Sequence, residues 1–268
     1  MASRVDLLRA YNDELRARVP AALPPDVEIE RDGPVQRVLG LKGHGYVEYH
    51  DLEGIAGRDL DELIARQIHV FAARGEAFEW KLHGHDLPED LPARLRAAGF
   101  VPEDEETVVI APVAAIAAEA QLPPGVVLRE ATERRDLDRI AVMEERVWSE
   151  AHGWLAERLE EELTLAPESL TVTIAEAGDD VVCAAWVRYE QGTQFATLWG
   201  GATLPDWRRR GIYRATVVCR ANLAAQRGFR YLEVDASADS RPILERLGFT
   251  PVTTTTPYVW SPRGEVSL

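Results

Sequence analysis

The feature that most constrains this chain is a proline turn followed by three arginines, a glycine and a long helical run. It stands between a strand-like segment at 195–204 and a helix-like segment at 214–226, and it reads Leu204-Pro205-Asp206-Trp207-Arg208-Arg209-Arg210-Gly211-Ile212-Tyr213. A helix start offers free backbone N–H groups and the positive end of the helix dipole, which together favour a phosphate. Because the whole chain has a formal net charge of −15, this local positive cluster predicts an anion site.

These residues resemble a motif of one known family. Arg208-x-x-Gly211-x-Tyr213 is similar to the Gln/Arg-x-x-Gly-x-Gly/Ala loop of the GNAT (GCN5-related) N-acetyltransferases, which binds the pyrophosphate of acetyl-CoA. Tyr213 departs from the pattern, because the family has Gly or Ala there, and this predicts a less open loop.

Flanking segments extend the resemblance over residues 195–249. Residues 201–207 resemble the end of the family's fourth strand and its proline turn, 231–236 its fifth strand, and 242–249, ending Leu-Gly-Phe, its short fourth helix. The resemblance implies an α/β (α+β) fold, in which helices flank a mixed, mostly antiparallel sheet.

The resemblance also implies which residues hold acetyl-CoA as co-substrate. The backbone of 202–204 is expected to hold the pantetheine arm, and the loop with the first helical turn to hold the pyrophosphate. Ser237 falls where many family members have an Asn that contacts the cofactor. The expected cofactor-binding residues are Ala202, Thr203, Leu204, Arg208, Arg209, Arg210, Gly211, Ile212, Tyr213, Arg214, Ser237 and Ser240.

The rest of the second half fits one unit of this fold. Val126 to Glu130 and three segments between 171 and 204 are rich in strand formers, and two helices are predicted between them. Thr132 is expected to cap the first of these helices. In the helix after the arginines, Ile212, Ala215, Cys219 and Leu223 form an apolar face, so Cys219 is predicted to be a core residue rather than a nucleophile.

The first half repeats part of this order. A helix ending near Gly75, a strand at 77–82 and a short helix ending Gly99-Phe100 follow one another as their counterparts do in the second half. The alternative is that small α/β units share such features by chance. We expect two tandem GNAT-like domains, with a degenerate copy lacking the CoA loop at 1–112, a linker at 113–125 and an acetyl-CoA-binding acetyltransferase domain at 126–268.

The usual catalytic groups of the family are missing from the matching positions. Leu244 stands where many members have a Tyr that protonates the leaving thiolate, and 193–204 contains no Asp or Glu to act as a base. Tyr213, Tyr231 and Tyr258 are conceivable acids, and spacing favours none of them.

Periodicity offers a replacement for the base. Glu144 lies near the middle of the apolar face of its helix, formed by Leu137, Ile140, Ala141, Met143, Val147 and Trp148. A carboxylate there must be paired, protonated or facing a cleft. We predict that Glu144 is catalytic and binds or deprotonates the amine. The alternatives are that it forms a buried ion pair, or that the helical-wheel projection is distorted by the ends of the helix.

The main hypothesis is transfer of an acetyl group from acetyl-CoA to a primary amine of an unidentified small molecule or peptide, by direct attack. The first alternative is a non-catalytic acyl-CoA-binding or sensor module, and the second is an unrelated nucleotide-phosphate site.

His152 lies in the usual acceptor loop of the family, although a lone loop histidine is more often solvated. His83 and His85 stand in a His-x-His-Asp cluster without a further ligand pair, so no metal is expected.

Composition limits the partners and the cellular compartment that we expect for this chain. Hydrophobic residues make up 46% of the chain, yet no apolar run approaches the ~20 residues of a membrane span, and the first residues lack a signal-peptide core. Strong acidity argues against nucleic acid as a partner, because phosphate backbones need a basic face. Only two cysteines are present, and no disulfide scaffold is indicated. We expect a cytoplasmic protein without a membrane partner, and a homodimer is left open.

Overall fold

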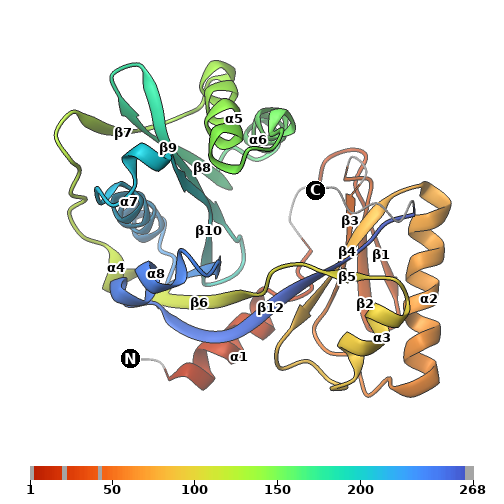
Figure 1. Cartoon of the computed structure of the whole chain (residues 1–268). Coiled ribbons are helices and arrows are strands. Elements are labelled where there is room, and N and C mark those ends of the chain that lie inside the picture. The colour runs from red at the N-terminus through yellow and green to blue at the C-terminus, as the bar shows by residue number, and fades with distance from the viewer. Residues whose placement is uncertain (1–2, 20–22, 42–43, 263–268) are drawn as a thin grey trace. The chain divides into compact units, whose positions relative to one another are not determined.

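The structure is a computed structural model that describes residues 3–19, 23–41 and 44–262, and it divides into two compact units (Figure 1). The first comprises Met1–Val109, Asp235–Arg241 and Pro251–Leu268, and the second Ile110–Val234 and Pro242–Thr250. The units therefore interleave along the chain rather than follow one another. The predicted functional division into 1–112, 113–125 and 126–268 stays a prediction.

The first unit contains a mixed, mostly antiparallel sheet. Its strands pair in the order β1–β2–β3–β4–β12, in which β3 and β4 run parallel and the other pairs antiparallel, and β5 pairs with β12. The elements are α1 Arg4–Glu14, β1 Glu28–Asp32, β2 Val35–Leu39, β3 His44–Tyr49, α2 Gly57–Arg74, β4 Ala77–His83, α3 Leu91–Ala97, β5 Val101–Pro102 and β12 Thr250–Trp260.

Alternation along β4 builds the core of this unit. Phe78, Trp80 and Leu82 point to one face and pack with apolar residues of α2 and α3, which lie on that face (Figure 1). Phe71 of α2 stacks on Phe78 with ring centroids 4.1 Å apart. His83 follows Leu82 and therefore faces the opposite side, where it meets α1.

The second unit contains a similar sheet. Its strands pair in the order β7–β8–β9–β10–β11, antiparallel except for the parallel pair β10–β11. The elements are α4 Val113–Ile116, β7 Val126–Glu130, α5 Arg134–Trp148, α6 Gly153–Leu165, β8 Leu170–Ala177, β9 Asp180–Tyr189, β10 Phe195–Thr203, the 3-10 helix η1 Pro205–Trp207, α7 Ile212–Gln226, β11 Tyr231–Ala236 and α8 Arg241–Leu247. Strand β6, Glu106–Pro112, runs along the chain from the first unit into the second.

Helices cover both faces of this second sheet, with α5 and α6 on one side and α7 on the other (Figure 1). Two expectations for α5 are wrong. Glu133, not Thr132, is its N-cap residue, and no side chain makes a cap hydrogen bond. Trp148 is 58% exposed, because it is the last residue of the helix and the apolar face no longer meets the sheet there.

Helix α7 also differs from its predicted pattern. Ile212 and Ala215 are buried, whereas Cys219 and Leu223 are only partly buried. The buried surface instead includes Thr216, Val217 and Arg220, because the helix packs against the sheet on one side and α4 on another. A count of apolar residues could not find a face that contains a buried arginine.

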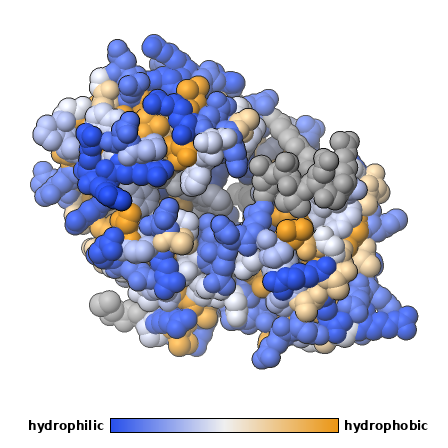
Figure 2. All heavy atoms as spheres, viewed as in Figure 1, coloured by the Kyte–Doolittle hydropathy of each residue, from blue (hydrophilic) through white to orange (hydrophobic). Residues whose placement is uncertain are grey.

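The two units repeat one arrangement, a strand, a helix and a parallel strand: β3–α2–β4 in the first unit and β10–α7–β11 in the second. On the face shown in Figure 2, hydrophilic residues cover most of the surface and hydrophobic residues form small groups. No helix in the described part of the chain combines the length and apolar character that a membrane span requires.

Candidate functional site

The candidate site begins where two parallel strands of the second unit separate. Strand β10 pairs with β11 only from Phe195 to Thr197, although β10 continues to Thr203. On its other edge β10 stays paired with β9 up to Thr203. The later part of β10 therefore presents backbone groups on the side from which β11 has departed, where an extended ligand can bind.

A β-bulge shapes this free edge. The register between β9 and β10 shifts between Gly200 and Ala202, and Gly200 and Gly201 have φ values of 65° and 90°. A side chain at either position would collide with a ring, since a Cβ on Gly200 would lie 2.5 Å from the Trp186 ring and one on Gly201 would lie 2.6 Å from the Tyr213 ring. Glycine is required at both positions by conformation and by space.

The arginine loop leads directly into a helix start, as predicted. After β10, η1 turns the chain, and α7 begins at Ile212 with Gly211 as N-cap residue at φ 85°. The first helical hydrogen bond runs from Ala215 N to Gly211 O over 2.9 Å, so the preceding amides lie outside the helical ladder. Arg209 also has a positive φ, 62°, a conformation that is uncommon for residues other than glycine.

The arginines around this helix start lack acidic partners. Arg208, Arg209, Arg210 and Arg214 are exposed, and within the described ranges none of them has a carboxylate oxygen within 4 Å. The chain has 45 acidic and 30 basic residues, and many of its other arginines form ion pairs. Four guanidinium groups without a carboxylate partner among the described residues lie beside a helix N-terminus, and this positive charge favours an anion.

Local contacts orient two of these arginines. Arg208 Nε donates to Thr203 O over 3.0 Å, which ties the loop to the end of β10, and the Arg210 guanidinium lies 4.6 Å from the centroid of the Trp207 ring. Leu204 is buried, and its backbone is already engaged, since its N–H donates to Val182 O and its C=O accepts from Trp207.

Other predicted cofactor residues have different surroundings. Ala202 and Tyr213 are half-buried, Ile212 is buried, and Thr203 is buried with its hydroxyl 3.3 Å from Cys183 Sγ. Ser237 and Ser240 belong to the segment Asp235–Arg241 of the first unit, where their hydroxyl oxygens lie 3.2 Å apart before α8. The part of these residues in cofactor binding stays a prediction.

Glu144 is buried, as its position on the helix predicts. Only 4% of the residue is exposed, and its Oε2 accepts a hydrogen bond of 2.7 Å from the indole N–H of Trp148. Its other oxygen, Oε1, is buried and has no hydrogen-bond partner in the described part of the chain. Burial raises the pKa of Glu144, while Trp148 and His152 act to lower it.

The other residues considered as acids, bases or nucleophiles are less suited to these roles. Leu244 is fully buried, as a core residue. Burial raises the pKa of Cys183 to about 11 and also raises that of Cys219, so neither thiol is activated as a nucleophile. His152 is half-buried at the start of α6, with its ring stacked near Trp154. Tyr231 and Tyr258 are buried, which leaves Tyr213 as the more accessible of the three tyrosines.

Solved structures share this arrangement over almost the whole chain. A GCN5-related N-acetyltransferase from Kribbella flavida superimposes with a TM-score of 0.66 at 14% sequence identity, covering 97% of this chain and 96% of that one. A tandem GNAT protein from the clavulanic acid biosynthesis pathway superimposes with a TM-score of 0.64 at 15% identity, covering 97% and 94%. This chain has a tandem GNAT fold.

A third structure agrees with this result. A GCN5-related N-acetyltransferase from Sphaerobacter thermophilus has a TM-score of 0.56 at 17% identity and covers 88% of this chain and 79% of that one. No model of a known family and no curated protein matches the sequence. The predicted resemblance is therefore confirmed at the level of the fold, in both halves of the chain.

The first unit carries different side chains at the corresponding place. The turn between β3 and α2 contains His50, Asp51 and Glu53 instead of arginines, and Glu53 N donates to Asp51 Oδ1 over 2.7 Å. Negative side chains at a helix start oppose the binding of a phosphate. This turn therefore lacks the positive charge that the arginine loop has in the second unit.

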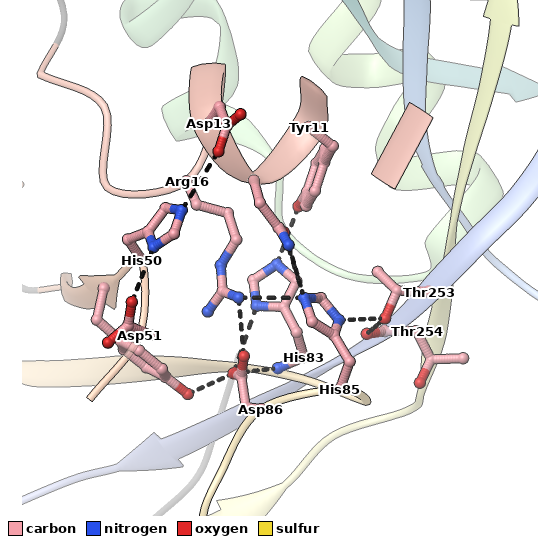
Figure 3. Close-up of polar contacts among 12 residues, drawn as sticks. Tyr11, Asp13, Arg16, His50, Asp51, His83, His85, Asp86, Thr253 and Thr254 are labelled. Carbon is pink, nitrogen blue, oxygen red and sulfur yellow. Dashed lines mark hydrogen bonds and ion pairs between the residues drawn. The ribbon is translucent and has the colours of Figure 1, made fainter. Parts of the chain in front are cut away.

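A buried polar cluster joins the ends of β3 and β4 in this unit (Figure 3). Asp86 accepts a hydrogen bond of 2.5 Å from the Tyr49 hydroxyl and forms an ion pair of 2.8 Å with Arg16, which follows α1. His83 Nε2 lies 2.9 Å from the Tyr11 hydroxyl, and burial lowers the pKa of His83 to about 4. Within residues 3–19, 23–41 and 44–262, no three His, Cys, Asp or Glu side chains are arranged to hold a metal ion.

Proposed function

We propose that the second unit of this chain is an acetyl-CoA-dependent N-acetyltransferase that acts on a primary amine of a small molecule or peptide. The observation that carries the proposal is the combination of a departing strand with an unpaired arginine loop at a helix start. Backbone groups of β10 after Thr197 suit the amides of a pantetheine arm, and residues 208–214 suit a pyrophosphate. Acetyl-CoA has both parts in this order.

The reaction needs few protein groups. The amine nitrogen attacks the thioester carbonyl carbon, a C–N bond forms, and the carbonyl electron pair moves to oxygen. When this intermediate collapses, the C–S bond breaks, CoA leaves as a thiolate, and the nitrogen loses a proton. Positioning of the two reactants supplies a large part of the acceleration.

Glu144 is the proposed acceptor of that proton. Its raised pKa brings it closer to the working pH than an ordinary carboxylate, which is what a general base needs. Its unpartnered Oε1 can accept a hydrogen bond from an ammonium group. Exposed Trp148 contacts Glu144, and exposed Trp154 lies against the half-buried His152 at the start of α6, so an acceptor can meet aromatic surface there.

The first unit is proposed to be a degenerate copy that has no acyl-CoA site of its own. Its turn before α2 carries acidic residues, and the ends of β3 and β4 are tied through Tyr49 and Asp86. Both features remove what the second unit offers to a cofactor, namely positive charge at the helix start and a free strand edge.

One observation favours a second candidate, an acyl-CoA-binding module without turnover. Leu244 occupies the position of the family's proton-donating Tyr, is fully buried and cannot donate a proton. A protein that had lost catalysis would keep the arginine loop and lose this residue.

Two measurements on the full chain separate the candidates. Calorimetry measures acetyl-CoA binding, and a thiol reagent measures CoA release over a broad panel of amines. Saturable binding with amine-dependent release supports the acetyltransferase, and binding without release from any amine supports the sensor. Binding of ATP but not of acetyl-CoA would overturn both.

A further inference from the structure

A fully buried arginine contacts the bulged strand of the candidate site. Arg220 of α7 is 1% exposed, and its Nη1 donates to two backbone carbonyls, Trp199 O over 3.0 Å and Trp186 O over 3.3 Å. Its Nε donates to Thr216 O over 3.1 Å within the helix. The guanidinium therefore connects α7 to β9 and β10 at one cross-strand pair.

This charge has no carboxylate to balance it. Among the described residues no Asp or Glu oxygen lies within 4 Å of Arg220. Burial lowers the pKa of Arg220, while Tyr213, Cys183 and Cys219 act to raise it. Arginine stays protonated in proteins, so a positive charge is held inside the second unit at a considerable desolvation penalty.

The position of this charge along β10 is specific. Trp199 and Trp186 are directly opposite each other, and the next residue, Gly200, begins the bulge. Trp199 also lies beyond Thr197, where β11 has already separated from β10. Arg220 thus holds the carbonyl of the first peptide of the bulge, at the free edge proposed for the pantetheine arm.

The peptide bond between Trp199 and Gly200 has a carbonyl that Arg220 binds and an N–H group that belongs to Gly200. No described bond besides Leu87–Pro88 is cis, so the C=O of Trp199 and the N–H of Gly200 point in opposite directions. With the Trp199 carbonyl bound to Arg220, the Gly200 N–H points away from the guanidinium. A hydrogen bond from a cation to the carbonyl also polarises the peptide and strengthens its N–H as a donor.

We propose that Arg220 is a positioning residue for the oxyanion, which aims and polarises the Gly200 N–H toward the acetyl carbonyl oxygen. As the amine nitrogen bonds to the carbonyl carbon, the C=O electron pair moves to oxygen, and the Gly200 N–H receives this charge. The C–S bond then breaks, the thiolate leaves, and the proton of the nitrogen passes to Glu144. The positive charge behind the peptide also favours the departing thiolate, which compensates for a hydrocarbon at Leu244.

The inference rests on the proposed function and has a test that does not need turnover. The probe is an analogue of acetyl-CoA in which a methylene replaces the sulfur and the ketone carbon is 13C-labelled, so that no transfer occurs. Infrared difference spectra give the C=O stretch of the bound ketone. In the natural chain we expect the stretch at a lower wavenumber than in water, since a strong donor weakens the C=O bond.

Arg220→Lys keeps the charge but not the planar two-carbonyl contact, and Arg220→Met removes the charge. We expect the stretch to move back toward its value in water in both variants, further in Arg220→Met, with an unchanged Kd for acetyl-CoA. Once an amine substrate is known, we expect kcat of both variants to fall roughly ten- to a hundredfold, while KM for acetyl-CoA stays the same. Arg227→Lys at the end of the same helix, where the side chain donates to Thr171, is the matched control.

The outcomes distinguish the two proposals. If the analogue does not bind the natural chain, the proposed function fails. If it binds and the stretch is the same in folded Arg220→Lys as in the natural chain, the role of Arg220 is overturned and the side chain only satisfies buried carbonyls. If both variants fail to fold, a measurement on the natural chain can still overturn the proposal. The Gly200 amide proton must shift downfield in NMR spectra when the analogue binds, and an unmoved signal overturns the proposal.

Discussion

The indole N–H of Trp148 donates a 2.7 Å hydrogen bond to Oε2 of Glu144, one turn earlier on α5. The ring of Trp148 is largely exposed, while the carboxylate is buried and keeps Oε1 without a partner among the described residues. The indole therefore fixes the orientation of a buried carboxylate whose second oxygen stays unused. This is the arrangement expected of a base that must accept a proton.

Replacing Glu144 by Gln tests the base directly. Glu144→Gln keeps the shape and the contact with Trp148 but cannot accept a proton, so kcat should fall by roughly 10²- to 10⁴-fold. The Kd for acetyl-CoA, measured by calorimetry, should be unchanged because the arginine loop is intact. Glu150→Gln, at an exposed residue beyond the same helix, should leave both values at those of the natural chain. A natural turnover rate in Glu144→Gln would remove this residue from the mechanism.

The pH dependence of the reaction should reveal the same group. Since the carboxylate is the active form and its pKa is raised, kcat/KM should fall on the acidic side at a higher pH than for an ordinary Glu. Trp148→Phe removes a hydrogen bond that lowers this pKa, so the acidic limb should move to still higher pH. A pH–rate profile measures both positions. An unmoved limb in Trp148→Phe would show that another group titrates.

The arginine loop can be tested with two acyl donors. In Arg209→Gln combined with Arg210→Gln, the Kd for acetyl-CoA should rise at least tenfold, because a charged hydrogen bond contributes about 1.5 to 3 kcal/mol. The Kd for S-acetylpantetheine, which lacks the pyrophosphate, should not change. The control is Arg58→Gln, at an exposed residue of the first unit that pairs with Glu62. Equal weakening for both donors would place the pyrophosphate elsewhere.

Local patterns predicted much of the second unit. Strand β11 begins and ends at the predicted residues, and Glu144 was found because a carboxylate interrupts an apolar helical face. Those signals depend on residues close in sequence, where spacing determines which side chains share a face. The GNAT fold was expected from the resemblance of residues 195–249 to that family, and the order of such elements agreed with it.

Long-range pairing could not be predicted in the same way. The strand-forming residues of β12 mark a strand but not its partner, and β12 pairs with β4 in the first unit. Arg220 was missed because a wheel assigns arginine to the polar face, whereas its burial depends on carbonyls of β9 and β10 at a bulge. No local pattern contains that information.

A carboxylate of the first unit should make stability depend on pH. Burial raises the pKa of Glu79 in β4 to about 7, against the attraction of Lys81. A raised pKa means that the folded state holds the proton more tightly than the unfolded state does. The protonated Glu79 therefore contributes fully to the stability of the fold at low pH, and this stability is lost as pH rises through 7. Glu79→Gln should therefore be more stable than the natural chain at pH 8, by about 1 to 3 kcal/mol, and similar at pH 4.5. Urea unfolding at both values measures this, and exposed Glu89→Gln should show no such difference.

The cluster in Figure 3 should determine how firmly α1 is held. Arg16 and Asp86 are each only 3% exposed as side chains, and removing one member of a buried pair leaves an uncompensated charge, which costs about 3 to 5 kcal/mol. Asp86→Asn should lower the free energy of unfolding by about this amount and accelerate amide hydrogen exchange in α1 and at the end of β4. Asp51→Asn, at an exposed neighbour, should change neither quantity. Unchanged protection of α1 in Asp86→Asn would mean that apolar contacts of Leu7 and Tyr11 alone hold the helix.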